Sequence, residues 1–253
     1  MGATLGFGVD IGGSGIKGGM VDLDAGKLHG ERIRVPTPDP SKPDAVADVV
    51  RQIVDEFGWT GSLGITLPAV IKRGIAHTAA NIDKTWLGTD AAALFAERLN
   101  LEPSEVVVLN DADAAGIAEI SYGWPDDRDG VVVLLTFGTG IGSALFRDGK
   151  LVPNTEFGHL EVDGHDAETR AAASVKEEND LSWAEWAKRV TRYVRSLEDL
   201  IWPDLIIAGG GVSKKADKWL PLLDVRTRVV AAELRNDAGI VGAAVAARQG
   251  HHG

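Results

Sequence analysis

The chain begins with a glycine-rich hairpin at residues 5–22, LGFGVDIGGSGIKGGMVD. Residues 5–10 and 16–21 have the β-branched, small and apolar composition of strands, and the intervening GGSG at 12–15 is typical of a tight turn. A further turn and a third strand at 28–35 follow. The sequence therefore predicts that the fold starts with an antiparallel meander.

A second copy of this opening lies in the middle of the chain. The apolar run 131–137 meets the turn motif TFGTGIG at 136–142 and continues as an apolar run at 143–146. In both copies a Gly-Lys-Leu triplet comes next, at 26–28 and at 149–151. Two halves with the same opening hairpin predict a duplicated α/β fold. Two such glycine turns facing each other across a cleft would surround a phosphate chain with backbone amides.

The remaining segments alternate between strand and helix patterns. After the Pro-rich segment 36–43, apolar spacing predicts a helix with Ser41 as its cap. Further strands are expected at 63–66, 69–75, 106–109 and 205–208, and further helices at 90–99, 112–120, 168–176, 183–200 and 238–248. We expect a small α/β domain of residues 1–110, completed by a C-terminal helix at about 238–253, and a large α/β domain of residues 111–237.

The composition argues against several classes of function. Lys and Arg total 26 against 37 Asp and Glu, and the net charge of −11 disfavours binding to nucleic acids or anionic membranes. The chain contains no Cys, so it has neither disulfides nor thiolate metal ligands. Residues 1–10 lack the pattern of a signal peptide, and no apolar run is long enough to span a bilayer. We therefore expect a cytoplasmic protein.

Three glycine clusters are the first candidates for a binding site. GSGIKG at 13–18 matches the pattern of dinucleotide-binding loops, but that loop needs a helix after it, and the residues here alternate like a strand. Each cluster alone is equally well explained by a tight turn, whereas three clusters favour amide cradles for phosphate. The expected phosphate-binding and nucleotide-binding residues are Asp10, Gly12, Gly13, Ser14, Gly15, Lys17, Thr136, Gly138, Thr139, Gly140, Gly142, Gly209, Gly210 and Gly211.

Two charged residues beside the first cluster carry more specific expectations. Asp10 is a candidate to hold Mg²⁺ through water molecules, because Mg²⁺ bound with phosphates takes few carboxylates and many waters. Lys17 either contacts a phosphate or is a solvated strand residue.

A polar pair, Asn110 and Asp111, follows the apolar strand 106–109 and precedes a helix. Both side chains are therefore expected at the carboxyl edge of a sheet, where α/β proteins bind ligands. Asp111 either accepts a proton from a hydroxyl group that attacks a phosphoryl group, or it caps the helix.

A later motif, EFGH at 156–159, offers acceptors and a switchable donor that suit a sugar ring, together with Glu168 downstream. Taken singly, Glu156, His159 and Glu168 are better explained as a surface acid, a loop histidine and a first-turn helix acid. Asn81 is either a further sugar contact or a turn-forming residue. His159 and His165 without any Cys do not predict a zinc site.

Five motifs, in order over nearly the whole chain, resemble the ROK (repressor, open reading frame, kinase) family of sugar kinases. They are DIGGSGIK (10–17), LNDADAA (109–115), TFGTGIG (136–142), EFGH (156–159) and IAGGGV (207–212). The resemblance implies a two-domain actin-like or hexokinase-like (ribonuclease H-like) α/β fold with a sugar in a central cleft. It also implies Asp111 as general base, and Mg²⁺ and the phosphoryl donor at the glycine clusters. The residues implied at the sugar are Thr66, Asn81, Asn110, Glu156, His159 and Glu168.

The chain departs from the family pattern in two places. Most members carry a Cys-rich zinc loop after the histidine, and the lack of Cys here means that no structural zinc is expected. Family repressors carry an N-terminal helix-turn-helix, which we do not expect here because strand residues start at Leu5.

Stretches 109–118, 134–145, 153–164 and 202–218 are similar to family members that use inorganic polyphosphate. We therefore expect an Mg²⁺-dependent glucokinase that uses polyphosphate, and ATP as well, and leave open whether mannose is accepted. The alternatives are an ATP-only hexose or N-acyl-hexosamine kinase, and a non-catalytic sugar-sensing regulator. Lys214, Lys215 and Lys218 either form a track for polyphosphate or are a solvated helix face. The resemblance favours a homodimer.

Overall fold

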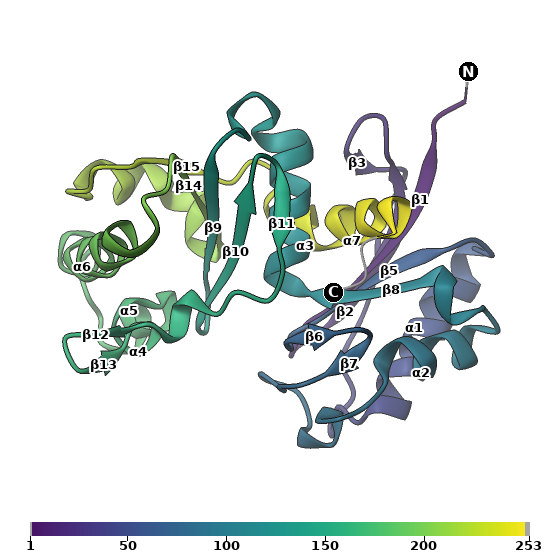
Figure 1. Cartoon of the computed structure of the whole chain (residues 1–253). Coiled ribbons are helices and arrows are strands. Elements are labelled where there is room, and N and C mark those ends of the chain that lie inside the picture. The colour runs from purple at the N-terminus through teal and green to yellow at the C-terminus, as the bar shows by residue number, and fades with distance from the viewer. Residues whose placement is uncertain (1, 251–253) are drawn as a thin grey trace. The chain divides into compact units, whose positions relative to one another are not determined.

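The chain folds into two compact units, which the computed structural model describes for residues 2–250, apart from the side chain of Arg235 (Figure 1). Unit 1 consists of the residues up to Tyr122 together with those from Asp237 onward, and unit 2 is Gly123–Asn236. Residues 251–253 of the expected C-terminal helix lie outside the described residues. No helix within residues 2–250 is long and apolar enough to cross a bilayer.

Unit 1 extends beyond the boundary that we expect after Asn110 from the sequence. The reason is that helix α3 (Asp111–Ala118) packs against the last helix, α7 (Ala238–Gln249), and both belong to this unit. Gly242 makes this packing close, since a Cβ there would lie 1.7 Å from the carbonyl oxygen of Ala114.

The sheet of unit 1 has six strands in the order β3-β2-β1-β5-β8, with β4 paired to β2. Their bounds are β1 Leu5–Ile11, β2 Ile16–Asp22, β3 Lys27–Leu28, β4 Ile33–Val35, β5 Leu63–Leu67 and β8 Val106–Asn110. The first strands form the predicted antiparallel meander, and β5 and β8 continue the sheet in parallel.

Two strands expected from the sequence are interrupted. The strand predicted at 28–35 is divided into β3 and β4 because Gly30 between them adopts a positive φ of 89°. The strand predicted at 69–75 is instead the hairpin of β6 (Ile71–Lys72) and β7 (Ile75–Ala76), since Arg73 and Gly74 both have positive φ. Local composition does not distinguish a continuous strand from one broken by a left-handed residue.

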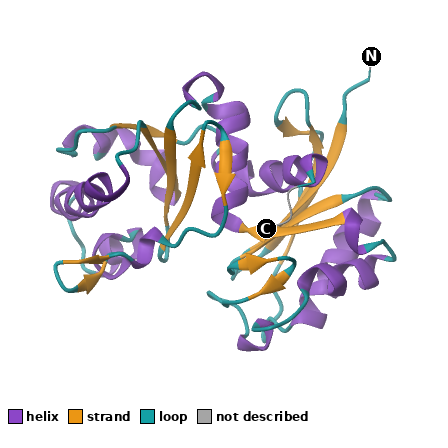
Figure 2. Cartoon of the chain, in the orientation of Figure 1, coloured by secondary structure: helices purple, strands orange, loops and turns teal. Residues whose placement is uncertain are grey.

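Helices cover both faces of this sheet (Figure 2). Phe7 of β1 packs against Phe57 of α1 (Pro43–Phe57), with ring centroids 5.3 Å apart, and α1 also contacts α2 (Ala91–Leu99). The next residue, Gly8, faces α7 instead, because side chains alternate along a strand, and a Cβ there would lie 1.9 Å from the carbonyl oxygen of Ile240. Glycine in this strand therefore allows α7 to pack directly on the sheet.

The predicted cap of α1 is wrong. The helix begins at Pro43, and the residue at its N-cap is Lys42, which makes no side-chain cap hydrogen bond. Ser41 has a different role, because its hydroxyl accepts a hydrogen bond of 3.0 Å from the backbone amide of Asp83. Pro43 at the first position lacks an N–H group, so the helix has one unsatisfied amide fewer at its start.

The sheet of unit 2 has five strands in the order β11-β10-β9-β14-β15. Their bounds are β9 Val131–Phe137, β10 Ile141–Arg147, β11 Lys150–Val152, β14 Leu205–Gly210 and β15 Arg228–Ala231. An antiparallel meander is again followed by two parallel strands. The two sheets therefore share one topology, as the repeated glycine hairpin predicts.

The rest of unit 2 consists of helices and one small hairpin. The helices are α4 Glu168–Ala171, α5 Ala173–Glu178 and α6 Trp183–Ile201, and the hairpin pairs β12 (Glu161–Val162) with β13 (His165–Asp166). The single helix predicted at 168–176 is divided because Ala172 has an extended backbone.

An aromatic cluster supports the glycine turns of unit 2. Phe137 at the end of β9 lies 5.7 Å from Trp186 of α6 and 5.6 Å from Trp219, measured between ring centroids. The indole N–H of Trp219 donates to the carbonyl oxygen of Val212, 3.2 Å away, just after the third glycine cluster. These buried rings therefore fix the backbone on which the turns depend.

Candidate active site

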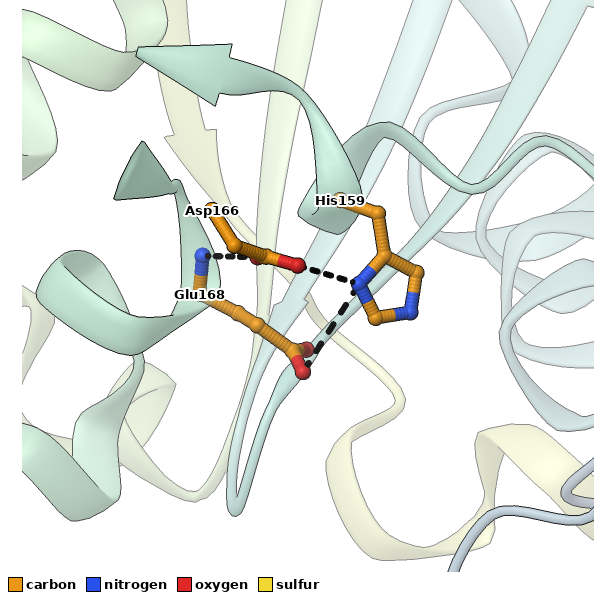
Figure 3. Close-up of side chains that lie close together, drawn as sticks. All are labelled: His159, Asp166 and Glu168. Carbon is orange, nitrogen blue, oxygen red and sulfur yellow. Dashed lines mark hydrogen bonds and ion pairs between the residues drawn. The ribbon is translucent and has the colours of Figure 1, made fainter. Parts of the chain in front are cut away.

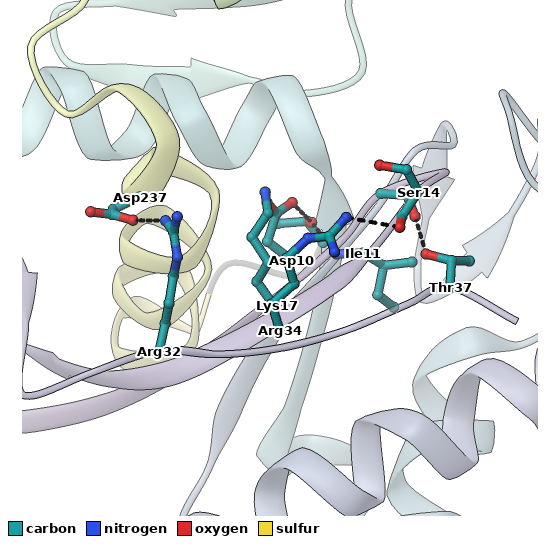
Figure 4. Close-up of polar contacts among 10 residues, drawn as sticks. Asp10, Ile11, Ser14, Lys17, Arg32, Arg34, Thr37 and Asp237 are labelled. Carbon is teal, nitrogen blue, oxygen red and sulfur yellow. Dashed lines mark hydrogen bonds and ion pairs between the residues drawn. The ribbon is translucent and has the colours of Figure 1, made fainter.

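The first glycine turn, Gly12–Gly15, joins β1 to β2 in unit 1 (Figure 4). The amide of Gly12 donates to the carbonyl oxygen of Gly15, 3.1 Å away, which closes the turn. Gly13 and Ser14 are exposed, whereas Gly15 is buried. A Cβ on Gly13 would lie 3.1 Å from the backbone oxygen of Asn81, so this turn and the predicted sugar contact Asn81 are neighbours within unit 1.

Asp10, at the start of this turn, has a defined set of partners (Figure 4). Its Oδ2 accepts from Lys17 Nζ and its Oδ1 from Thr66 Oγ1, each at 3.0 Å. Thr66 is fully buried, and its hydroxyl also accepts from the amide of Ile11. Thr66 therefore holds Asp10 in place, and its contact with the sugar stays a prediction.

Lys17 faces Asp10 across the β1–β2 ladder and forms an ion pair with it, and its contact with a phosphate stays a prediction. Oxygen ligands for a hydrated Mg²⁺ are present at Asp10, whose two carboxylate oxygens can each accept more than one bond. The side chain of Asp10 is 18% exposed, which leaves it accessible. The donor set at Asp10 therefore fits a cation that keeps most of its water.

Two residues beside the first turn escape prediction from the sequence. Arg34 of β4 donates through Nη2 to the carbonyl oxygen of Ser14 at 3.0 Å, and Thr37 donates through its hydroxyl to that of Gly12 at 2.6 Å (Figure 4). Arg34 is exposed and has no ion pair among residues 2–250. It reaches the turn because β4 pairs with β2 so that Arg34 is opposite Lys17. No motif marks this pairing in the sequence.

The pair Asn110 and Asp111 lies where β8 meets α3. The N-cap is Asn110, whose Oδ1 accepts from the amides of Ala112 and Asp113 at 2.8 and 3.2 Å. Asp111 is the first residue of the helix and is exposed, and its Oδ1 accepts from the amide of Ala112 at 2.9 Å. The capping role that competes with catalysis for Asp111 thus belongs mainly to its neighbour.

The side chain of Asn110 is partly engaged within the protein, whereas Asn81 is exposed. Asn110 Nδ2 donates to the carbonyl oxygen of Ala69 at 3.2 Å, so one N–H of this amide stays available. Asn81 is exposed and has a positive φ of 58°. This conformation agrees with the turn-forming alternative that the sequence leaves open for Asn81. It does not prevent the side chain from binding a sugar.

The second and third glycine clusters lie together at one edge of the unit 2 sheet. β9 and β14 are parallel neighbours, with Thr136 opposite Gly209 and Phe137 opposite Gly210. Gly210 has a φ of 82°, and a Cβ there would lie 2.2 Å from the carbonyl oxygen of Phe137, so only glycine fits. Gly138, in contrast, is exposed, and a Cβ on it would meet nothing within 4 Å.

The second glycine turn is hydrogen-bonded to helix α5. The amide of Gly138 donates to the carbonyl oxygen of Gly140 at 2.9 Å, and the hydroxyl of Ser174 donates to that of Thr139 at 2.7 Å. Gly142 is already within β10, where it pairs with Thr136. The exposed part of the cluster is therefore confined to Gly138 and Thr139.

Glu168 connects the second turn with the predicted sugar residues. Its Oε2 accepts from the amide of Ile141 at 3.0 Å, and its Oε1 lies 3.9 Å from Nδ1 of His159 (Figure 3). A Cβ on Gly140 would lie 2.3 Å from Oε2 of Glu168. The carboxylate thus fills the space that the missing side chain of Gly140 leaves.

Asp166 completes this group, and the sequence does not single it out. Its Oδ2 lies 2.8 Å from Nδ1 of His159, and its Oδ1 accepts from the amide of Glu168 at 3.2 Å (Figure 3). The hydrogen bond with Asp166 raises the pKa of His159, partial burial lowers it, and the charges of Glu168, Asp166 and Glu156 raise it. An acid two positions before the predicted helix start is the only signal that the sequence offers for this contact.

Glu156 also belongs to this group by its electrostatics. Partial burial of its carboxyl group raises the pKa of Glu156, His159 lowers it in part, and Glu168 raises it further. Glu156 precedes the 3₁₀ turn Phe157–His159, which directs both titratable side chains to the same part of unit 2.

The donor set of this group does not fit a structural zinc ion. His159, Asp166 and Glu168 offer ligand atoms within 4.8 Å of one another, the one such group among the described residues. A closed zinc site takes four ligands, commonly with Cys, and this chain has none. The Nδ1 atom and both carboxylates already have partners in the protein.

Comparison with known proteins gives a consistent result. The sequence pattern of the ROK family matches residues 6–174. The polyphosphate glucokinase of Mycobacterium tuberculosis (strain CDC 1551 / Oshkosh) is 59% identical over 241 residues, which cover 95% of this chain and 90% of the relative.

Two solved structures extend the likeness to the whole fold. The inorganic polyphosphate/ATP-glucomannokinase of Arthrobacter sp. strain KM has a TM-score of 0.91 at 52% identity and covers 98% of this chain and 100% of its own. A ROK family glucokinase from Streptomyces griseus, in complex with glucose and AMPPNP, has a TM-score of 0.81 at 26% identity, covering 97% and 100%. The actin-like or hexokinase-like fold class that the resemblance implies is confirmed.

Proposed function

Because the chain belongs to the ROK family, we propose that it is a kinase that phosphorylates the 6-hydroxyl of glucose from inorganic polyphosphate and from ATP. The observation that carries the proposal is the 59% identity, over 95% of this chain, to the mycobacterial polyphosphate glucokinase. The likeness to the Arthrobacter polyphosphate/ATP-glucomannokinase supports ATP as a second donor and makes mannose the first other acceptor to test.

Asp111 is the general base in this proposal. Its exposed carboxylate, at the carboxyl end of β8, accepts the proton of the 6-hydroxyl as that oxygen attacks the terminal phosphorus of the donor. The new bond joins the sugar oxygen to phosphorus, and the bond from phosphorus to the bridging oxygen breaks. The leaving group is ADP or a polyphosphate chain that is one phosphate shorter.

The sugar is assigned to polar side chains that have capacity left for hydroxyl groups. They are Asn81, Asn110, Glu156, His159 and Glu168. Carboxylates accept hydrogen bonds from hydroxyl groups, while the amides and the imidazole can also donate, and this mixture suits a ring with several hydroxyls. Thr66 contributes indirectly by holding Asp10.

The donor phosphates are assigned to the backbone amides of the glycine turns. Successive N–H groups in such a turn can point at one anion. Arg34 adds a guanidinium group at the first turn. Mg²⁺ belongs to the proposal as well, with Asp10 holding it through water. When bound, the ion would neutralise charge on the phosphates.

The path of the polyphosphate chain is assigned to Lys214, Lys215 and Lys218. They lie in the 3₁₀ segment Gly211–Lys218, which starts at the third glycine cluster, and all three are exposed. Within the described part of the chain none of them has an ion pair, whereas Arg192 of the same unit is paired with Asp163. Unneutralised lysines are what a polyanion requires.

The substitution Asp111→Asn tests the base. We expect kcat to fall roughly 10²- to 10⁴-fold while the Kd for glucose changes little, because the amide keeps the shape but accepts no proton. Asp44→Asn is the matched control, since Asp44 is the first-turn acid of α1 as Asp111 is of α3. A variant of Asp111 that keeps nearly full turnover would remove it from the mechanism.

Kinetics with both donors and several acceptors test the activity as a whole. The proposal requires glucose 6-phosphate to form from polyphosphate and from ATP. Transfer from ATP alone, or to an N-acyl-hexosamine in preference to glucose, would support the other kinases, and absence of any transfer would support a sugar-sensing regulator. The homodimer and the cytoplasmic location remain predictions.

A further inference from the structure

We propose that Asp166 is a positioning residue for the sugar, whose carboxylate holds the proton of His159 on Nδ1 and so presents Nε2 to a sugar hydroxyl. This inference rests on the proposed function, because it assumes that His159 contacts the sugar. Asp166 itself is not assigned any contact with a substrate.

The contacts of Asp166 link two of the residues assigned to the sugar. One oxygen, Oδ2, lies 2.8 Å from Nδ1 of His159, and the other, Oδ1, accepts from the backbone amide of Glu168 at 3.2 Å. Figure 3 shows both contacts, with the second nitrogen of the His159 ring pointing away from the two carboxylates. A single carboxylate thus orients an imidazole ring and the start of the helix that carries Glu168.

The chemistry of the pair decides the tautomer. An ionised carboxylate can only accept hydrogen bonds, so a nitrogen 2.8 Å from it must carry the proton. In a neutral imidazole the other nitrogen is then an acceptor, which suits a hydroxyl donor. The acidic groups facing this ring are Glu156, Asp166 and Glu168, and the bond to Asp166 is the largest cause of the raised pKa of His159.

Asp166 is well placed to act as a fixed support. It lies in β13, where it pairs with Glu161 of β12, and its carbonyl oxygen accepts from the hydroxyl of Thr169 at 2.6 Å. Glu168 is held from its other end by the amide of Ile141. Both the backbone and the neighbours of Asp166 are therefore constrained, which is what orienting another side chain requires.

Exposure argues for orientation over stability as the purpose of this contact. The side chain of His159 is 57% exposed and that of Asp166 is 39% exposed. Ion pairs and hydrogen bonds at such positions contribute little to folding. A contact that adds little stability is better explained by the group that it presents.

The experiment compares three variants of the full chain by two measurements. Nitrogen-15 NMR of the histidine rings reports which nitrogen of His159 is protonated, and titration with glucose gives a Kd independent of turnover. The variants are Asp166→Ala, Asp166→Asn and the control Asp163→Asn. Asp163 lies in the turn of the same hairpin, where it pairs with Arg192 instead of His159.

We expect the wild type to hold the proton on Nδ1 and Asp166→Ala to populate both tautomers. Asp166→Ala should raise the Kd and KM for glucose roughly ten-fold while kcat changes much less, as for loss of one charge-assisted hydrogen bond. Asp166→Asn keeps an acceptor oxygen without the charge. It should retain most of the affinity, and His159 should titrate at lower pH because the largest cause of its raised pKa is weakened.

Three results would overturn the inference. Asp166→Ala could leave the tautomer as in the wild type, or leave the affinity for glucose unchanged. Alternatively, Asp163→Asn could reproduce the loss, which would assign the effect to the stability of the hairpin. A wild-type protein that transfers no phosphate to glucose would refute the proposed function, whereas the tautomer of His159 would still decide the role of Asp166.

Discussion

The substitution Gly140→Ala is expected to separate sugar binding from donor binding within a single turn. A Cβ at this position would lie 2.3 Å from Oε2 and 3.1 Å from Cδ of Glu168, and real Cβ atoms do not approach other atoms within 3.0 Å. The carboxylate must therefore move, and its 3.0 Å hydrogen bond from the amide of Ile141 is lost.

The size of the effect follows from the bond that is lost. A hydrogen bond to a charged group contributes about 1.5–3 kcal/mol, which corresponds to an increase of roughly 10- to 150-fold in the KM for glucose as an upper limit. The helix that carries Glu168 keeps its contacts with Asp166, so the displacement is confined to the side chain. The KM for the donor should change much less.

Gly138→Ala is the matched control in the same turn. A Cβ there would meet nothing within 4 Å, so the fold and Glu168 stay as they are. The methyl group would stand where a phosphate is expected to approach the backbone, and the donor KM should rise while the glucose KM stays constant. The assay is initial-rate kinetics with glucose and polyphosphate varied in turn.

The reasoning is refuted if the two variants behave alike. It is also refuted if Gly140→Ala raises the KM for the donor and leaves that for glucose unchanged, because Glu168 would then have no part in sugar binding. Thermal unfolding of both variants shows whether a general loss of stability explains the kinetics.

Two further predictions concern the donor track and the pH dependence. Changing Lys214, Lys215 and Lys218 together to Gln should raise the KM for polyphosphate several-fold at low salt and leave the KM for ATP unchanged. The reaction with polyphosphate should also become less sensitive to salt. Equal effects on both donors would refute the polyphosphate track. Burial raises the pKa of Glu156, so binding that needs its ionised form should weaken as pH falls through a range above that of an ordinary glutamate. Glu156→Gln should abolish this acid limb of the glucose Kd profile, and a profile unchanged in the variant would exclude Glu156.

The strands, turns and repeated hairpin could be predicted from the sequence because they depend on local properties. Alternating residues identify β1 and β2, a continuous apolar run identifies β9, and clustered glycines identify the turns after β1 and β9. The family motifs could be recognised for the same reason, since each is a short contiguous stretch of sequence.

The sequence was less informative where two residues compete for one role or where distant strands meet. Asn110 takes the N-cap and leaves Asp111 exposed, although either residue type fits a cap. The sequence does not show that Thr66 is buried and donates a hydrogen bond to Asp10. Arg34 reaches the first glycine turn only because of the register between β4 and β2.

The repeated hairpin and the order of the family motifs were thus sufficient to predict a duplicated α/β kinase fold and its glycine turns, because local propensity and short contiguous patterns encode them. Folding alone determined which side chains touch. Asp166 contacts His159 because the β12–β13 hairpin pairs as it does, and Gly140 leaves room for Glu168 because β10 and α4 approach each other there. Such contacts depend on strand register and on the volume of neighbouring side chains, which no segment of the chain specifies without its partners.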